Sequence, residues 1–168
     1  GFADLAPGFY TSVFIVRADD PVTRLADCAD YRFGYSDALS QSGWGGAWAT
    51  ARAQGLALLP DLKTGSHNAS LAAVANGKAD LASIDAVTWR NQQRWEPDAA
   101  RVRVIGQTVA SPGMTFVTAQ GRDPAPYRAA IAAAIAALPQ RHADTLGLRG
   151  IVALPADAYD IRLPDRPA

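Results

Sequence analysis

The sequence predicts an α/β fold with a mainly parallel sheet flanked by helices. Short apolar runs rich in β-branched residues alternate with Ala-rich segments of helical character, and the connections between them are short. The 168 residues, 49% of them hydrophobic, are enough to bury the core of an ordinary globular domain.

The first third of the chain is expected to form two strands and then a helix. Residues 9–18 (FYTSVFIVRA) are rich in β-branched and aromatic residues, which favours a strand. A helical turn at 25–27 and a short strand at 31–35 are expected next. The Ala-rich stretch 44–55 follows a serine-containing turn and ends in a glycine, as helices commonly do.

The same order repeats in the middle of the chain. We expect an extended segment at 56–65, a polar turn, a helix at 69–77, a buried strand at 79–85 and a helix at 86–95.

The last third is expected to contain two more strands and a long helix. The strands are 101–109 and 114–119, separated by a turn. The helix covers 124–138 and carries Ile131, Ile135 and Leu138 on one face, at positions i, i+4 and i+7.

The composition argues against several functions. Sixteen Lys and Arg balance sixteen Asp and Glu, so no global charge would attract nucleic acid. One cysteine and two histidines fit no zinc-ligand spacing, so no metal or cofactor is expected. The apolar runs are too short to span a bilayer, so direct membrane insertion is not expected either.

Two polar turns, SQSG at 40–43 and TGSH at 64–67, precede expected helices. A helix N-terminus offers unpaired N–H groups and a partial positive charge, which suit an oxyanion such as phosphate. Ser40 and Ser42 would add hydroxyl donors, and Gly43 would let the backbone approach the ligand. The alternative is that either serine merely caps its helix.

His67 and Asp85 are the other candidates for ligand binding. His67 precedes the second helix and is a potential donor to the same anion, although a loop histidine is often structural. Asp85 ends an apolar strand, where a carboxylate is costly unless it is paired or used. The alternative for Asp85 is that it caps the helix that follows.

An enzymatic function finds little support. Ser66 or Ser42 as nucleophile, His67 as base and Asp85 as its partner would form a triad, but the G-x-S-x-G motif is missing. Ser66 and His67 are also adjacent, which makes it hard for them to face each other. Phosphate-loop and dinucleotide-binding motifs are absent from the sequence, so no catalytic residue is predicted.

Several stretches, taken in order, resemble one known family. They are FYTSVFIVRADD, YRFGYSDALSQSGW, TGSHNASLAAVANGKADLASIDAVTW, VRVIGQTVASPGMTFVT and YDIRLPD. The family is that of phosphate-, phosphite- and phosphonate-binding periplasmic proteins that serve ABC importers. The resemblance implies a type II periplasmic binding protein fold, with two α/β lobes joined by hinge strands and a ligand held in the cleft.

The resemblance implies a domain organisation in which the first lobe is largely absent. Residues 1–18 would contain the first hinge strand, 19–106 the α/β ligand-binding lobe, and 107–168 the second hinge strand with a C-terminal helical return. The chain opens at Gly1 without a leader, so we expect either a removed targeting segment or a piece of a longer protein. The isolated chain is expected to self-associate through apolar surface meant for the other lobe.

The resemblance also assigns the site. Ser40, Gln41, Ser42 and His67 would grip the oxyanion, with Tyr10 from the first hinge strand and Asp85 from the strand end beside it. The stretch TVASPG has no acid to meet an ammonium group, which favours phosphate, phosphite or a small alkylphosphonate over an aminophosphonate.

The implied partner is the membrane permease of an ABC importer, and the implied location is periplasmic or otherwise extracytoplasmic. The competing function is that of a ligand-sensing effector domain in a regulator, because the same fold serves both purposes.

Overall fold

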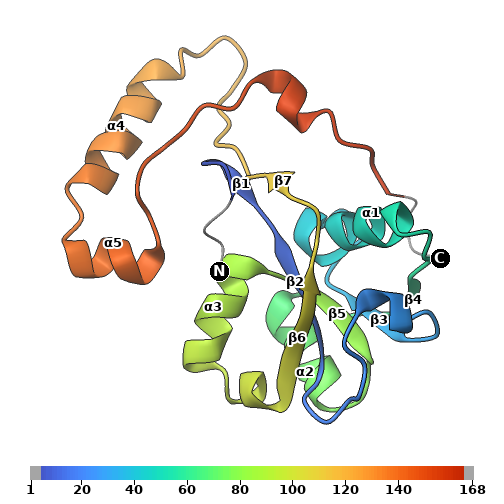
Figure 1. Cartoon of the computed structure of the whole chain (residues 1–168). Coiled ribbons are helices and arrows are strands. Elements are labelled where there is room, and N and C mark those ends of the chain that lie inside the picture. The colour runs from blue at the N-terminus through green and yellow to red at the C-terminus, as the bar shows by residue number, and fades with distance from the viewer. Residues whose placement is uncertain (1–4, 165–168) are drawn as a thin grey trace. The chain divides into compact units, whose positions relative to one another are not determined.

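The computed structural model describes residues 5–164 of the chain (Figure 1). The chain divides into two units. The sheet unit comprises Tyr10–Ser111 and Ile161–Ala168, and the helical unit comprises Gly1–Phe9 and Pro112–Asp160. The chain therefore passes from one unit to the other three times.

A five-stranded sheet in the order β4-β3-β5-β2-β6 forms the centre of the sheet unit. Its central strand β5 pairs in parallel with β3 and antiparallel with β2, and β6 pairs antiparallel with β2. Four strands thus run in one direction, as the prediction of a mainly parallel sheet requires, and β2 runs against them. The strands are β2 (Ser12–Arg17), β3 (Arg32–Tyr35), β4 (Leu59–Lys63), β5 (Leu81–Asp85) and β6 (Val102–Gln107).

Helices cover both faces of this sheet. One face meets α2 (His67–Ala75) and α3 (Ala86–Trp95), and the other meets α1 (Gly46–Ala53). Short 3₁₀ turns complete the unit at Leu25–Asp27 and Pro97–Arg101.

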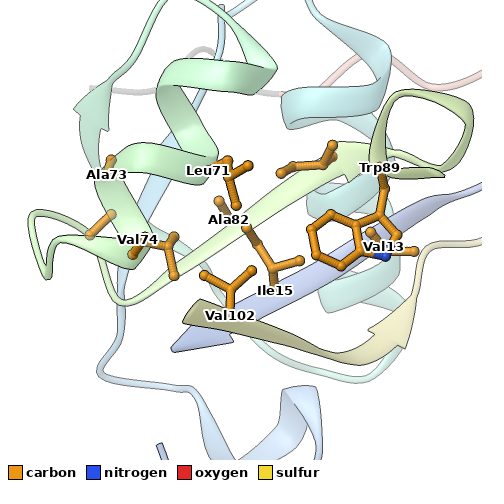
Figure 2. Close-up of a cluster of buried hydrophobic side chains, with 11 residues drawn as sticks. Val13, Ile15, Leu71, Ala73, Val74, Ala82, Trp89 and Val102 are labelled. Atoms are coloured by element: carbon orange, nitrogen blue, oxygen red, sulfur yellow. The ribbon is translucent and has the colours of Figure 1, made fainter. Parts of the chain in front are cut away.

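The two buried clusters follow from the alternation of side chains along β2. Val13 and Ile15 point to the α2 and α3 face, whereas Phe14 and Val16 point to the α1 face. Figure 2 shows the first cluster, in which Val13 and Ile15 pack with Leu71, Val74, Ala82, Trp89 and Val102. In the second cluster Phe14 packs with Phe33, Trp44, Ala47 and Leu81, among others.

The direction of the strands determines where polar turns gather. The parallel strands β3, β4 and β5 each lead into a helix, so the three connections leave the same edge of the sheet. Polar residues that follow these strands are thereby brought to one place, as is common for ligand sites of α/β proteins.

The C-terminal segment of the described chain rejoins the sheet unit at α1. The guanidinium group of Arg162 lies 5.6 Å from the ring centre of Trp48, and that of Arg52 lies 5.5 Å from it. Cation–π attraction to the indole thus holds residues of the C-terminal segment against this helix.

The helical unit contains α4 (Ala125–Ala136), α5 (Gln140–Leu146) and a 3₁₀ turn at Ala156–Tyr159. Among its described residues only Pro112 is buried. An apolar groove of about 540 Å³ runs along it, lined among others by Phe116, Tyr127, Ile131 and Val152. Ile131, Ile135 and Leu138, which share the predicted apolar face, are only half-buried.

Most of the predicted elements are confirmed, with some changes of boundary. The strand expected at 9–18 is split into β1 (Phe9–Tyr10) and β2, and β1 pairs with β7 (Ser111–Pro112). The helix expected from residue 44 already begins at Gln41, as a π-helical turn that leads into α1.

The strand predicted at 114–119 is wrong. These residues form no strand, and Met114, Phe116 and Val117 are 96%, 74% and 87% exposed. Their β propensity is expressed only where a neighbouring strand is available to pair with, and here the described chain supplies none. No helix among residues 5–164 is long and apolar enough to cross a membrane.

Candidate functional site

The turn after β3 is a π-helical turn over Gln41–Gly45. Ser40 caps it, because its Oγ accepts a hydrogen bond of 3.0 Å from the Gly43 N–H. Gly43 is tightly enclosed, and a Cβ built on it would lie 2.0 Å from Ser36 Oγ. A larger residue would force Ser36 or the turn to move, so glycine at this position lets the sequence SQSG form a turn that brings backbone N–H groups and the Ser42 side chain to the sheet edge.

The turn after β4 places His67 at the first position of α2. Gly65 has a φ of +88°, a conformation that glycine adopts at little cost. Ser66 then caps the helix by accepting a bond of 3.1 Å from the Ala69 N–H. Ser66 is thus engaged as a helix cap, a role that the sequence analysis considered for Ser40 and Ser42 but not for Ser66.

The two turns meet through Ser42 and His67. Ser42 Oγ and His67 Nε2 lie 2.9 Å apart, within hydrogen-bond distance. Ser83 on β5 donates from its hydroxyl to the Ser42 carbonyl oxygen at 2.8 Å, which ties the first turn to the centre of the sheet. Two predicted ligand residues from different helix starts are therefore in direct contact.

Asp85, at the end of β5, caps α3. Its Oδ1 accepts a hydrogen bond of 2.8 Å from the Thr88 N–H, which was the alternative role for this residue. Its carboxylate also acts electrostatically on two predicted site residues, Tyr10 and His67. Burial, with Asp85 as a smaller cause, raises the pKa of Tyr10 to about 12, so the phenol keeps its proton and remains a donor.

The surroundings of His67 favour its neutral form. Burial lowers its pKa from the ordinary value, while the Asp85 carboxylate and the Ser83 backbone oppose that shift. The second ring nitrogen, Nδ1, is buried without a hydrogen-bond partner of ordinary geometry. Asp85 therefore does not orient this ring as the acid of a catalytic triad would.

Gln41 belongs to the same turn as Ser42, but its side chain bonds to a residue outside the two polar turns. Its Nε2 donates to Ser111 Oγ at 2.9 Å, and Ser111 lies in β7. The structure thus gathers Ser42 with His67 and places the Asp85 charge near His67 and Tyr10, whereas Ser40 is engaged as a cap and Gln41 as a tether.

Three polar residues around the site were missed by sequence reasoning. Ser83 is fully buried in β5, and a lone serine in the apolar run ADLASID is a signal that could have marked it. Ser111 and Thr108 are also buried, and Thr108 Oγ1 accepts from the Ser12 N–H at 2.9 Å. Their surroundings in the sequence carry no comparable signal.

Metal binding finds no support in the described part of the chain. Residues 5–164 contain no group of three or more His, Cys, Asp or Glu side chains placed to hold an ion. The donor set at the sheet edge consists instead of hydroxyls, an imidazole, a phenol and helix-start N–H groups, which suits an anion.

Solved structures of ligand-binding proteins share this fold. A Xanthomonas citri protein solved with bound chloride matches 89% of this chain and 61% of its own at 20% identity, with a TM-score of 0.68. PhnD1 from Prochlorococcus marinus, in complex with methylphosphonate, matches 61% of this chain and 42% of its own at 19% identity, with a TM-score of 0.56.

A binding-protein component of an ABC phosphonate transporter from Pseudomonas aeruginosa is also similar. It is 27% identical, with a TM-score of 0.54 over 64% of this chain and 38% of its own. The present chain thus spans less than two thirds of the length of each of these proteins. A search of curated proteins found no match.

The family itself is established by sequence. Residues 3–159 match the family described as "ABC transporter, phosphonate, periplasmic substrate-binding protein", and the chain belongs to it. The family consists of solute-binding proteins and not of enzymes. The resemblance noted in the sequence is thereby confirmed.

Proposed function

We propose that the protein is the substrate-binding component of an ABC importer and binds a small phosphorus oxyanion, namely phosphate, phosphite or an alkylphosphonate. The observation that carries this proposal is the contact between Ser42 and His67, which joins two helix starts at the same edge of the sheet. Membership of the phosphonate-binding family supports the ligand class.

In this proposal the oxyanion binds where the two helices begin. The N–H groups of the turn Gln41–Gly45 and the start of α2 provide partial positive charge, and Ser42 and His67 provide side-chain donors. Tyr10 adds a phenol that stays protonated up to a pH of about 12. Ser40 and Gln41 shape the turn through their bonds to Gly43 and Ser111.

The absence of an acid from residues 108–113 favours a ligand without an ammonium group. Asp85 is the charged group that acts on His67, and it is already used as a helix cap. We therefore place aminophosphonates behind phosphate, phosphite and methylphosphonate in order of expected affinity.

The domain organisation is part of the proposal. Residues 19–106, which contain both turns, would form the ligand-binding lobe, with hinge strands in 1–18 and at the start of 107–168. The match to less than two thirds of each relative supports a cleft completed by a second lobe. An ABC permease would be the partner and the periplasm the location, in keeping with the family.

The test is calorimetric titration of the full-length protein with phosphate, phosphite, methylphosphonate, 2-aminoethylphosphonate and sulfate. Saturable binding of at least one phosphorus oxyanion, unaltered after recovery, is expected. If the folded protein binds none of them, the proposal fails. Stimulation of a reconstituted permease by the loaded protein would distinguish an importer component from a sensory domain, which would not stimulate it.

A further inference from the structure

The side-chain amide of Gln41 ties the first polar turn to Ser111. Gln41 begins the π-helical turn that carries Ser42, and its Nε2 donates to Ser111 Oγ at 2.9 Å. Ser111 is only 5% exposed, and a hydrogen bond shielded from water is electrostatically stronger than one at the surface. The side chain that the resemblance assigns to the ligand is therefore engaged with a residue 70 positions further along the chain.

Gly45 makes room for this arrangement. A Cβ built on Gly45 would lie 2.5 Å from Gln41 Oε1, so the amide lies against the bare backbone of this glycine. The next residue along, Pro164, would be at an ordinary contact distance of 3.7 Å. The backbone of Gly45 is helical, with φ −58° and ψ −45°, so its conformation does not require glycine. A side chain at this position would therefore disturb chiefly the amide of Gln41.

Ser111 belongs to the strand pair that carries Tyr10. The short strand β7 begins with Ser111 and is hydrogen-bonded to β1, which ends with Tyr10. Tyr10 and Ser42 are both donors in the function proposed above, and they come from distant parts of the sequence. The bond from Gln41 to Ser111 links the turn of Ser42 to the strand pair of Tyr10.

We propose that Gln41 is a positioning residue, which keeps the donors of Ser42 and Tyr10 at the spacing that one oxyanion needs, and that its side chain does not touch the ligand. The proposal rests on the oxyanion-binding function proposed above. The backbone N–H of Gln41 remains available to the anion, because the first N–H groups of a helix have no partner within it. Ser111 acts on the site only through the amide of Gln41.

The experiment is calorimetric titration of the full-length protein with methylphosphonate, using Gln41→Ala, Ser111→Ala and the double variant. Each single variant should weaken binding about three- to tenfold, the worth of one neutral hydrogen bond. The double variant should bind no more weakly than either single variant, because the two side chains act through the same bond. Gln54→Ala, at the C-terminal end of α1, is the control and should bind as the wild type does.

Gly45→Ala separates positioning from stability. Alanine favours a helix over glycine, so this variant should unfold at a temperature no lower than that of the wild type. Its methyl group displaces the amide of Gln41, so it should nevertheless weaken methylphosphonate binding about as much as Gln41→Ala does. In the Gln41→Ala background the same change should leave the affinity unaltered. A purely structural role for Gln41 would not lower affinity while stability is kept.

The outcomes separate this inference from the function on which it rests. If Gln41→Ala weakens binding and Ser111→Ala does not, or if their losses add, the amide contacts the ligand and the inference is overturned. Unchanged affinity in both single variants, or a loss from Gly45→Ala that persists in the Gln41→Ala background, overturns it as well. In each case the oxyanion function stands. Failure of the folded wild-type protein to bind any oxyanion overturns both.

Discussion

Serines of the same two turns have different roles. Replacing one should therefore lower ligand affinity, whereas replacing the other should lower stability. Ser42 reaches His67, whereas Ser66 caps α2. Losing a hydrogen bond to a charged ligand costs about 1.5–3 kcal/mol, roughly ten- to a hundredfold in affinity. Ser42→Ala and His67→Ala are each expected to weaken methylphosphonate binding on that scale, with little change in Tm, as measured by calorimetry and thermal unfolding.

Ser66→Ala is the control for this prediction. The loss of a cap costs about 0.5–2 kcal/mol of stability, so this variant should lower Tm more than it lowers affinity. A Ser42→Ala protein that binds normally but unfolds at a clearly lower temperature would show that Ser42 is structural.

Gly43 is a second position where a single replacement should have a clear effect, in this case on the stability of the fold. A Cβ there would meet Ser36 Oγ at 2.0 Å, so the turn or the side chain has to move. Gly43→Ala is expected to destabilise the fold by about 1–3 kcal/mol, typical of overpacking, as measured by urea denaturation. Gly150→Ala, at a position open to solvent, is the matched control and should be nearly neutral.

The double variant Ser36→Ala/Gly43→Ala checks the cause of this destabilisation. It removes the clashing hydroxyl and should recover part of the lost stability. An equally unstable double variant would mean that the backbone, and not Ser36, requires glycine.

Among the elements, β3 and β5 are tied by an ion pair whose pH dependence can be predicted. Arg32 on β3 bonds to both oxygens of Asp80 at 2.8 and 2.9 Å, just before β5. This hydrogen-bonded partner lowers the pKa of Asp80 below its ordinary value. The stabilisation is therefore fully present above the unfolded-state pKa of about 4 and is lost as the pH falls through the lower folded value.

Asp80→Asn is expected to lower the free energy of unfolding at pH 7, with the difference from wild type shrinking towards pH 2. Urea denaturation across this range measures it. Asp19→Asn is the control, because the Arg17–Asp19 pair lies at the surface and contributes little. A constant difference at all pH values would mean that the Asn side chain disturbs packing and that the charge is not the cause.

The observed strands and helices also show which features of the fold could be predicted from the sequence and which could not. Periodicity and turn residues located the strands and helices around both polar turns. The helix-start argument and the resemblance both named Ser42 and His67, which the fold brings together. The reversed direction of β2 could not be predicted, because alternation along a strand carries no information on its direction. The strand at 114–119 was wrong because β propensity was judged without a pairing partner, and the π-helical turn depends on packing at Gly43 that spacing does not reveal.

For the whole molecule, the exposed apolar surface of the helical unit predicts self-association of the isolated chain. Among the described residues of this unit only Pro112 is buried, and Met114, Phe116 and Val117 are largely exposed. Apolar surface of this kind gains free energy by burial against a partner. Sedimentation over a concentration series should show dimers or larger species of the 168-residue chain.

A triple variant provides the control for self-association. Met114→Gln, Phe116→Gln and Val117→Thr together should shift the chain towards monomer without changing the sheet unit. A wild-type chain that stays a compact monomer at all concentrations, and binds as tightly as the full-length protein, would contradict the expectation of a missing lobe.

The antiparallel position of β2 has a consequence for the order of folding. Val13 on this early strand pairs with Ile84 and with Gln107, so its neighbours in the sheet are synthesised much later than the strand itself. Contacts between residues so distant in sequence are slow to form, whereas β3, β4, β5 and their helices are connected locally. We therefore expect the turns that hold Ser42 and His67 to assemble first. Insertion of β2 would then bring Tyr10 to the site as one of the last steps of folding.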